Sequence, residues 1–98
     1  MTINKKLEGT KLELLLEGRL DTTTSPMLEA ELKQSIEGVT ELVFDFEKLE
    51  YISSAGLRIL LAAQKIMNKQ GNMVVKNVNE IVDEVFEVTG FSDILTIE

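Results

Sequence analysis

Hydrophobic and polar residues alternate near the start of the chain. In residues 11–17, "KLELLLE", leucines recur at every second position and glutamates occupy the opposite side, with Leu15 as the one interruption. An alternation of period two is typical of a β-strand that is buried on one face. A weaker strand is expected at residues 2–7, and the short "EGT" between the two runs predicts a hairpin.

The pattern then changes to a helical period. After a polar connection at residues 18–24, Ser25 and Pro26 predict a helix start, because the N–H that proline lacks would have had no partner at the first helical position. Apolar residues at fourfold spacing follow: Leu28, Leu32 and Ile36. They predict one buried stripe, and Gly38 is expected to end the helix.

The centre of the chain predicts a strand, a helix and a second strand. Residues 41–46 and 73–75 are nearly continuous apolar runs, as expected of strands that are covered on both faces. Between them a long helical pattern spans residues 54–69 and stops at Gly71. Such a βαβ unit has a right-handed crossover in nearly all known cases, so the two strands are expected to be parallel and in one sheet.

The end of the chain predicts a further helix at residues 79–89, with Gly90 as its stop. Residues 93–97, "DILTI", are expected to add a short terminal strand. With 98 residues and no linker or internal repeat, the whole chain, residues 1–98, is interpreted as a single domain.

Composition narrows the classes of function. The chain has 44% hydrophobic and 28% charged residues, neither cysteine nor histidine, and a net charge of −7. Disulfides and thiolate metal sites are therefore excluded, and the acidic balance argues against nucleic-acid and membrane partners. No signal-peptide core or membrane-spanning run is found, so a cytoplasmic protein without metal or cofactor is expected.

Ser54 and Gly56 form half of a nucleophile elbow, the G-x-S-x-G turn of serine hydrolases. Position 52 is isoleucine instead of glycine, and the chain has no histidine that could deprotonate the hydroxyl. A serine–lysine dyad with Lys48 or Lys65 has no recognised spacing. We therefore expect a protein that is not an enzyme and has no catalytic residue.

Two other interpretations of Ser53 and Ser54 remain open. Either serine could cap the long helix, which would contribute about 0.5 to 2 kcal/mol. Alternatively, a serine at a helix N-terminus is a site for phosphorylation, since the free N–H groups and the helix dipole tolerate the added charge. Gly56, which costs about 1 kcal/mol relative to alanine inside a helix, suggests a close approach to the backbone there.

The long helix also carries a line of cations. Arg58, Ala62, Lys65 and Lys69 follow an i, i+4, i+7, i+11 pattern and share one face. This face could steer an acidic partner surface, or it could be an ordinary solvated helix face.

Three motifs together resemble a known family. They are "GRLD" at residues 18–21, "LVFDFEKLEYISSAGL" at 42–57 and "VVKNVNEIVDEVFEVTGFSDIL" at 74–95. The chain is similar over almost its whole length to the bacterial anti-sigma factor antagonists of the STAS domain family. The resemblance and the pattern together imply an α/β fold, with a small mixed β-sheet of four to five strands flanked by three to four helices.

The resemblance also implies a mechanism. In that family the unphosphorylated antagonist binds an anti-sigma factor that is a serine kinase, phosphorylation releases it, and a serine phosphatase resets it. The phosphorylated serine matches Ser54 here; Ser53, where aspartate is common in the family, is the alternative. Asp21 matches a family position beside this site, although a turn aspartate that bonds its own backbone is an equally simple interpretation.

The expected partner-binding residues are those of the loop after "GRL" and of the helix start. They are Asp21, Thr22, Thr23, Ser53, Ser54, Ala55, Gly56, Leu57 and Arg58. A monomer or weak dimer is expected. The alternative function is that of a STAS structural subunit, not phosphorylated, in a transport or signalling complex.

Overall fold

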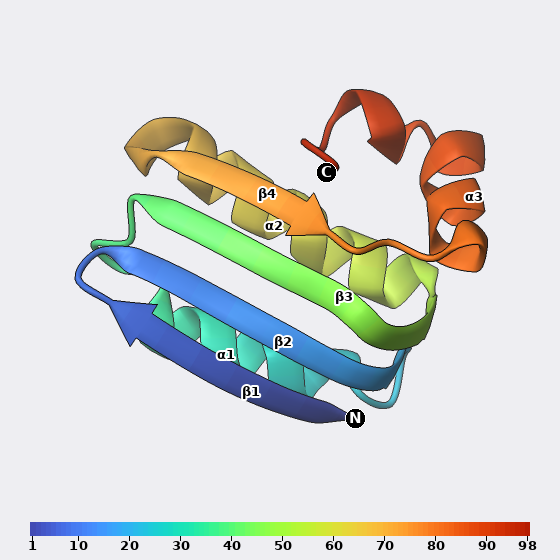
Figure 1. Cartoon of the computed structure of the whole chain (residues 1–98), viewed down its shortest axis with the longest axis horizontal. Helices are drawn as coiled ribbons and strands as arrows, with labels where there is room; N and C mark the ends of the chain where they lie inside the picture. The colour runs from blue at the N-terminus through green and yellow to red at the C-terminus, as the bar shows by residue number, and fades with distance from the viewer.

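A computed structural model describes all 98 residues as four strands and three α-helices, with one short 3₁₀ helix (Figure 1). In chain order the elements are β1 (Thr2–Glu8), β2 (Lys11–Leu20), α1 (Ser25–Ser35), β3 (Glu41–Ile52), α2 (Ser54–Gln70), β4 (Asn72–Lys76), α3 (Glu80–Thr89) and η1 (Phe91–Asp93). The expected mixed α/β fold is confirmed.

The strands lie in the order β1-β2-β3-β4. β1 and β2 are antiparallel and form the expected hairpin, in which Gly9 has the positive φ of 60° that the two-residue turn requires. β3 and β4 are parallel, as the βαβ pattern predicted, and β2 is also parallel to β3. The carboxyl ends of β2, β3 and β4 therefore lie at the same edge of the sheet (Figure 1).

Two strands are longer than the pattern predicted. β2 continues to Leu20 and β3 to Ile52, which are partners in the register although the pairing shifts twice along the way. Both side chains are fully buried, so the core draws the chain into extended pairing where polar neighbours had suggested a loop. The predicted terminal strand is reduced to one parallel bridge between Val75 and Ile97.

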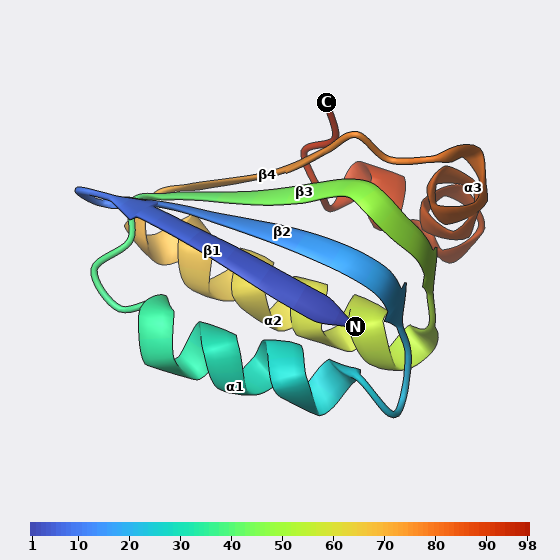
Figure 2. The same cartoon turned by 60° about the horizontal axis from the view of Figure 1, so that its bottom comes forward.

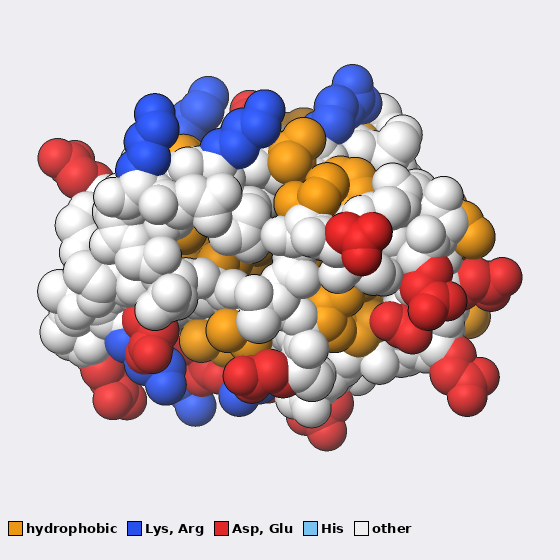
Figure 3. All heavy atoms as spheres, turned by 90° about the horizontal axis from the view of Figure 1, so that it is seen from above, with side chains coloured by type: hydrophobic (Ala, Val, Ile, Leu, Met, Phe, Trp, Pro, Cys, Tyr) orange, Lys and Arg blue, Asp and Glu red, His pale blue; other side chains and the backbone are white.

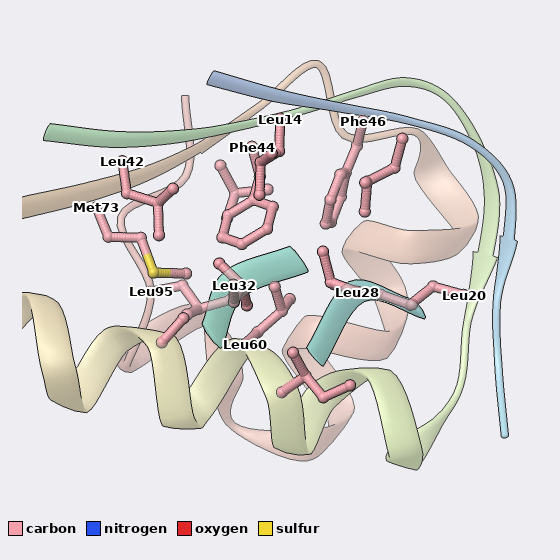
Figure 4. Close-up of a cluster of buried hydrophobic side chains, with 14 of the residues drawn as sticks. Leu14, Leu20, Leu28, Leu32, Leu42, Phe44, Phe46, Leu60, Met73 and Leu95 are labelled. Atoms are coloured by element: carbon pink, nitrogen blue, oxygen red, sulfur yellow. The ribbon is translucent and has the colours of Figure 1, made fainter. Parts of the chain in front are cut away.

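The two long helices cover one face of the sheet, and α3 lies at one end of it (Figure 2). The core fills the space between sheet and helices, where Leu14, Phe44 and Phe46 point from the strands toward Leu28, Leu32 and Leu60 (Figure 4). α3 closes the end of the core, since Phe86 packs 6.5 Å from Phe46 between ring centroids.

The opposite face of the sheet carries charged side chains together with the apolar Leu15, Val43 and Val74. Lys76 of β4 forms a 3.0 Å ion pair with Glu13 of β2, across β3. The hydrogen bond and the charge of Glu13 raise the pKa of Lys76.

Candidate functional site

The ends of β2 and β3 join the two predicted parts of the site. The backbone N–H of Ser53 donates a hydrogen bond of 2.9 Å to the carbonyl oxygen of Leu20. Asp21 follows Leu20 directly, and Ser54 follows Ser53. The "DTTT" loop and the start of α2 are therefore neighbours, as the sequence predicted.

The two serines differ in how their side chains lie. Ser53 is the N-cap residue of α2, with extended backbone angles, and its carbonyl oxygen accepts a 3.0 Å hydrogen bond from the Leu57 N–H. Its Oγ is buried and has no hydrogen-bond partner, and its side chain makes no cap bond. Ser54 is the first residue of the helix and is exposed. The side-chain cap considered for these serines is therefore wrong, because neither hydroxyl bonds a free backbone N–H.

Gly56 requires a correction. The sequence suggested that a partner approaches its backbone, but Gly56 is buried against the chain's own core. A Cβ at this position would lie 2.8 Å from Ile52 Cγ1 and 2.7 Å from Leu20 Cγ. Leu57, 5% exposed, also belongs to the core. These two expected partner-binding residues shape the start of α2 from inside and do not face outward.

Asp21 holds the loop in shape. Its Oδ1 accepts hydrogen bonds from the N–H groups of Thr23 and Thr24, at 3.0 and 3.1 Å, as in an Asx turn. The Thr24 hydrogen bond, against an opposing effect of desolvation, lowers the pKa of Asp21, with further help from Thr23 and the charge of Arg19. The turn interpretation therefore describes the geometry of Asp21. Thr22 and Thr23 are exposed at the tip of the loop.

One pair beside the site was missed by the sequence analysis. The Arg19 guanidinium lies 4.7 Å from the centroid of the Tyr51 ring, a cation–π arrangement. Arg19 is also 3.9 Å from the Asp21 carboxylate, measured from Nε to Oδ2. Arg19 and Tyr51 are partners in the register of β2 and β3. The sequence pattern did not predict that the two strands extend this far, so it could not predict the pair.

The cation face of α2 is present. Arg58, Ala62, Lys65 and Lys69 are all exposed, and no cation among them forms an ion pair within the chain. Figure 3 shows basic side chains in a row along one edge of this view and acidic ones gathered at the α3 end. Ala55, by contrast, is half-buried.

Hydrolase geometry does not form around Ser54. No hydrogen bond links it to Lys48 or Lys65, and Lys65 is eleven residues along the same helix, about 16 Å away. No three Asp or Glu residues come together as a metal-binding group. None of the helices is long and apolar enough to cross a membrane.

The structure is thus a small mixed sheet with two helices on one face and an exposed serine at the start of the second helix. The chain belongs to the STAS domain family, whose profile matches residues 3–98. The family expected from the motifs is thereby confirmed.

Relatives of known name agree with this. The chain is 38% identical over 94 residues to BtrV of Bordetella bronchiseptica, a candidate anti-sigma factor antagonist, covering 94% of this chain and 80% of BtrV. It is 24% identical over 98 residues to the anti-sigma-B factor antagonist of Bacillus subtilis, covering 99% and 90%. Antagonists of this kind are regulatory binding proteins and not enzymes, in agreement with the expected class.

Solved structures show the same fold. An anti-sigma factor antagonist from Mycobacterium paratuberculosis superimposes with a TM-score of 0.88 at 22% identity, over 98% of this chain and 83% of that one. The phosphorylated form of the Bacillus cell fate determinant SpoIIAA gives a TM-score of 0.77 at 19% identity, over 99% and 91%.

Proposed function

We propose that this chain, acting as one STAS domain over residues 1–98, is an anti-sigma factor antagonist controlled by phosphorylation of Ser54. In the unphosphorylated state it binds an anti-sigma factor that is a serine kinase, which frees the sigma factor. Phosphorylation releases the antagonist, and a serine phosphatase resets it. The relatives named as antagonists, and a solved relative in a phosphorylated form, support this role.

The observation that carries the proposal is the contrast between two neighbouring hydroxyls. Ser54 is exposed at the first position of α2, whereas the Oγ of Ser53 is buried. A kinase must bring the hydroxyl in line with the transferred phosphoryl group, so only an outward side chain can react without local unfolding. This favours Ser54 over Ser53.

The binding surface follows from exposure. We place it on the exposed Thr22, Thr23, Ser54 and Arg58, together with the half-buried Asp21, Ser53 and Ala55. Gly56 and Leu57 support this surface from the core. Arg58 lies one helical turn from Ser54. It contributes a positive charge without an ion-pair partner to a chain whose net charge is −7.

Release follows from charge. A phosphoserine carries about two negative charges. At about 6 Å from one partner carboxylate, with an effective dielectric near 20, the repulsion is roughly 5 kcal/mol, which weakens binding about a thousandfold or more. At its own position the phosphate is tolerated, because the N-terminus of the 17-residue α2 helix favours negative charge.

Incubation of the chain with its cognate kinase and ATP, followed by mass spectrometry of the modified peptide, tests the proposal. We expect one phosphate, on Ser54, absent from Ser54→Ala and retained in Ser53→Ala. Phosphate on Ser53 alone contradicts the assignment of the site. A chain that binds a transport or signalling complex and accepts no phosphate supports the structural-subunit function instead.

A further inference from the structure

Two exposed surfaces of the chain are left without partners. One is a groove between α1 and α2, whose apolar lining comes from Leu32, Ile36, Ile59, Ala62 and Ile66. The other is a stripe on α3 made of the exposed Ile81 and Val88 with the partly buried Val85 between them, which recur at i, i+4 and i+7. The groove shares Arg58 with the proposed partner-binding surface, whereas the α3 stripe lies outside that surface.

The groove is shaped for a side chain. Its volume is about 190 Å³. Pockets that hold small-molecule ligands usually measure about 300 to 1,000 Å³, so this groove is small for a free ligand. Ile66 is 42% exposed at its wall, which leaves apolar surface for an inserted side chain to cover. A helix that lays one or two aliphatic residues into the groove fits this space.

The groove is bordered by positive charge. Arg58 lies at its rim, and Lys65 and Lys69 continue along the outer side of α2. None of the three forms an ion pair within the chain, whereas Lys33, on the α1 side, is paired with Glu29 at 3.7 Å. The occupant that this rim selects is therefore an acidic amphipathic helix.

α3 has the properties of such an occupant. Ile81 is 59% and Val88 is 76% exposed, although both are large and apolar. The acidic residues Glu80, Asp83, Glu84 and Glu87 line the same helix, which has no basic residue, and none of them is in an ion pair. The opposite side of α3, Val82 and Phe86, is already buried in the core.

A single molecule cannot bring the two surfaces together. The groove lies between α1 and α2 on the helix-covered side of the sheet, whereas α3 lies at the end of the sheet (Figure 2). Contact therefore requires a second copy. Because the two surfaces are different, a single contact leaves the other surface of each copy free. Association through these surfaces therefore extends head-to-tail or closes into a ring, of which a two-fold dimer is the smallest.

We infer that the chain associates with itself head-to-tail, by docking the acidic apolar stripe of α3 into the basic-rimmed groove between α1 and α2 of the next copy. A ten-residue helix is about 15 Å long and buries little area. The contact is weak, with a Kd on the order of 1 mM. It forms where the protein is concentrated and weakens as salt is added.

Amide chemical shifts, followed from about 0.05 to about 2 mM across the expected Kd, test this inference. In the wild-type chain we expect concentration-dependent shifts at Ile66 and Val88 and none on β1. Lys65→Glu/Lys69→Glu reverses the charge beside the groove, and Glu84→Lys/Glu87→Lys reverses the charge on α3. Each double variant is expected to weaken association at least about tenfold. An equimolar mixture of the two variants regains association, because opposite charges then face each other again.

The controls separate this contact from general charge effects. Lys6→Glu/Lys48→Glu makes the same change of charge at two exposed positions outside both surfaces, and it is expected to leave the wild-type shifts unchanged. The α3 variant lowers the net negative charge, so general repulsion alone would make it associate more strongly than wild type. That result, or a wild-type chain whose shifts do not depend on concentration, overturns the inference.

A remaining outcome assigns the groove to another occupant. If the wild-type chain is monomeric at about 2 mM while the cognate kinase shifts Ile66, the groove belongs to the kinase interface and the self-association is wrong. Phosphorylation of Ser54 is measured separately, so a failure here does not affect the proposed function.

Discussion

Gly56 lies directly against Leu20, so that a Cβ on Gly56 would stand 2.7 Å from Leu20 Cγ and 2.9 Å from Leu20 Cδ2. This packing explains why a helix tolerates glycine in its first turn. The chain's own β2 strand ends there, and the close contact fixes α2 against the loop that begins at Asp21.

Gly56→Ala is therefore expected to destabilise the fold. Helix propensity alone favours alanine by about 1 kcal/mol. Overpacking of a filled core costs about 1 to 3 kcal/mol, and Leu20 is fully buried, so the unfavourable effect is the larger one. Urea denaturation measures the difference. Ala62→Gly, at an exposed position of α2, serves as the control. Its free energy of unfolding is expected to fall by about 1 kcal/mol, the difference in helix propensity alone.

A stabilised Gly56→Ala variant would mean that Leu20 moves aside freely. The double variant Leu20→Ala/Gly56→Ala distinguishes the two cases. If Leu20 resists the added methyl group, Gly56→Ala lowers the free energy of unfolding less in the Leu20→Ala background than in the wild-type chain. The two free-energy changes are then not additive.

Ser53→Ala is expected to leave stability unchanged or to raise it slightly. A serine N-cap that bonds the helix contributes about 0.5 to 2 kcal/mol, but Ser53 Oγ is buried without a partner, and removing an unpaired polar group relieves a desolvation penalty. Asn79 provides the comparison at α3, where its side chain also donates a hydrogen bond of 2.9 Å from Nδ2 to the Leu49 carbonyl oxygen. Its Oδ1 accepts from the Val82 N–H at 2.8 Å, so Asn79→Ala should lose about 1 kcal/mol from the cap and a further contribution of about 0.5 to 1.5 kcal/mol from the bond to Leu49. Equal losses at the two positions would restore the cap interpretation for Ser53.

Asp21→Asn is expected to lower stability at neutral pH, with a loss that disappears in acid. The hydrogen bonds from the loop hold the pKa of Asp21 below its ordinary value. The ionised carboxylate therefore stabilises the fold above about pH 4, and this contribution is lost as the pH falls through the lowered folded-state pKa. The measurement is the thermal midpoint of both proteins from neutral pH downward.

Glu50→Gln is the control for Asp21→Asn, since Glu50 is exposed and in no ion pair. The thermal midpoint of Glu50→Gln should equal that of the wild-type chain at every pH. If the difference in thermal midpoint between wild type and Asp21→Asn stays constant as the pH falls, the stability of the Asx turn does not depend on the charge of Asp21.

The sequence predicted the fold well because its strongest signals were periodic. The alternating leucines of β2 and the long apolar pattern of α2 are both found where expected. The ends of β2 and β3 were not predicted, since Leu20 and Ile52 pair only through contacts between distant parts of the chain. Local pattern carries no information about such pairing.

The candidate site was predicted only in part. The proximity of the "DTTT" loop and the α2 start was implied by the family resemblance, and the structure explains it by the parallel pairing of β2 and β3. The directions of Ser53 and Gly56 were not predicted, because a helix start can rotate so that either neighbour faces inward. Only the packing of Leu20 and Ile52 fixes that rotation.

The last prediction concerns the switch itself. Ser54→Ala should bind the cognate kinase as wild type does, because the helix start and its charge are unchanged. Ser54→Asp adds one negative charge, which at about 6 Å from a partner carboxylate and an effective dielectric near 20 is worth about 3 kcal/mol, or roughly a hundredfold in Kd.

Surface plasmon resonance with immobilised kinase measures both affinities. Raising the salt should narrow the gap between the alanine and aspartate variants, since screening weakens charge repulsion at an exposed site. Ser92→Asp introduces the same charge at an exposed serine beside Phe91, in the C-terminal segment, and should bind like wild type. If Ser92→Asp binds as weakly as Ser54→Asp, the effect comes from net charge and not from the helix start. If both bind normally, the phosphate must act through the shape of the interface, because charge at this position alone does not separate the partners.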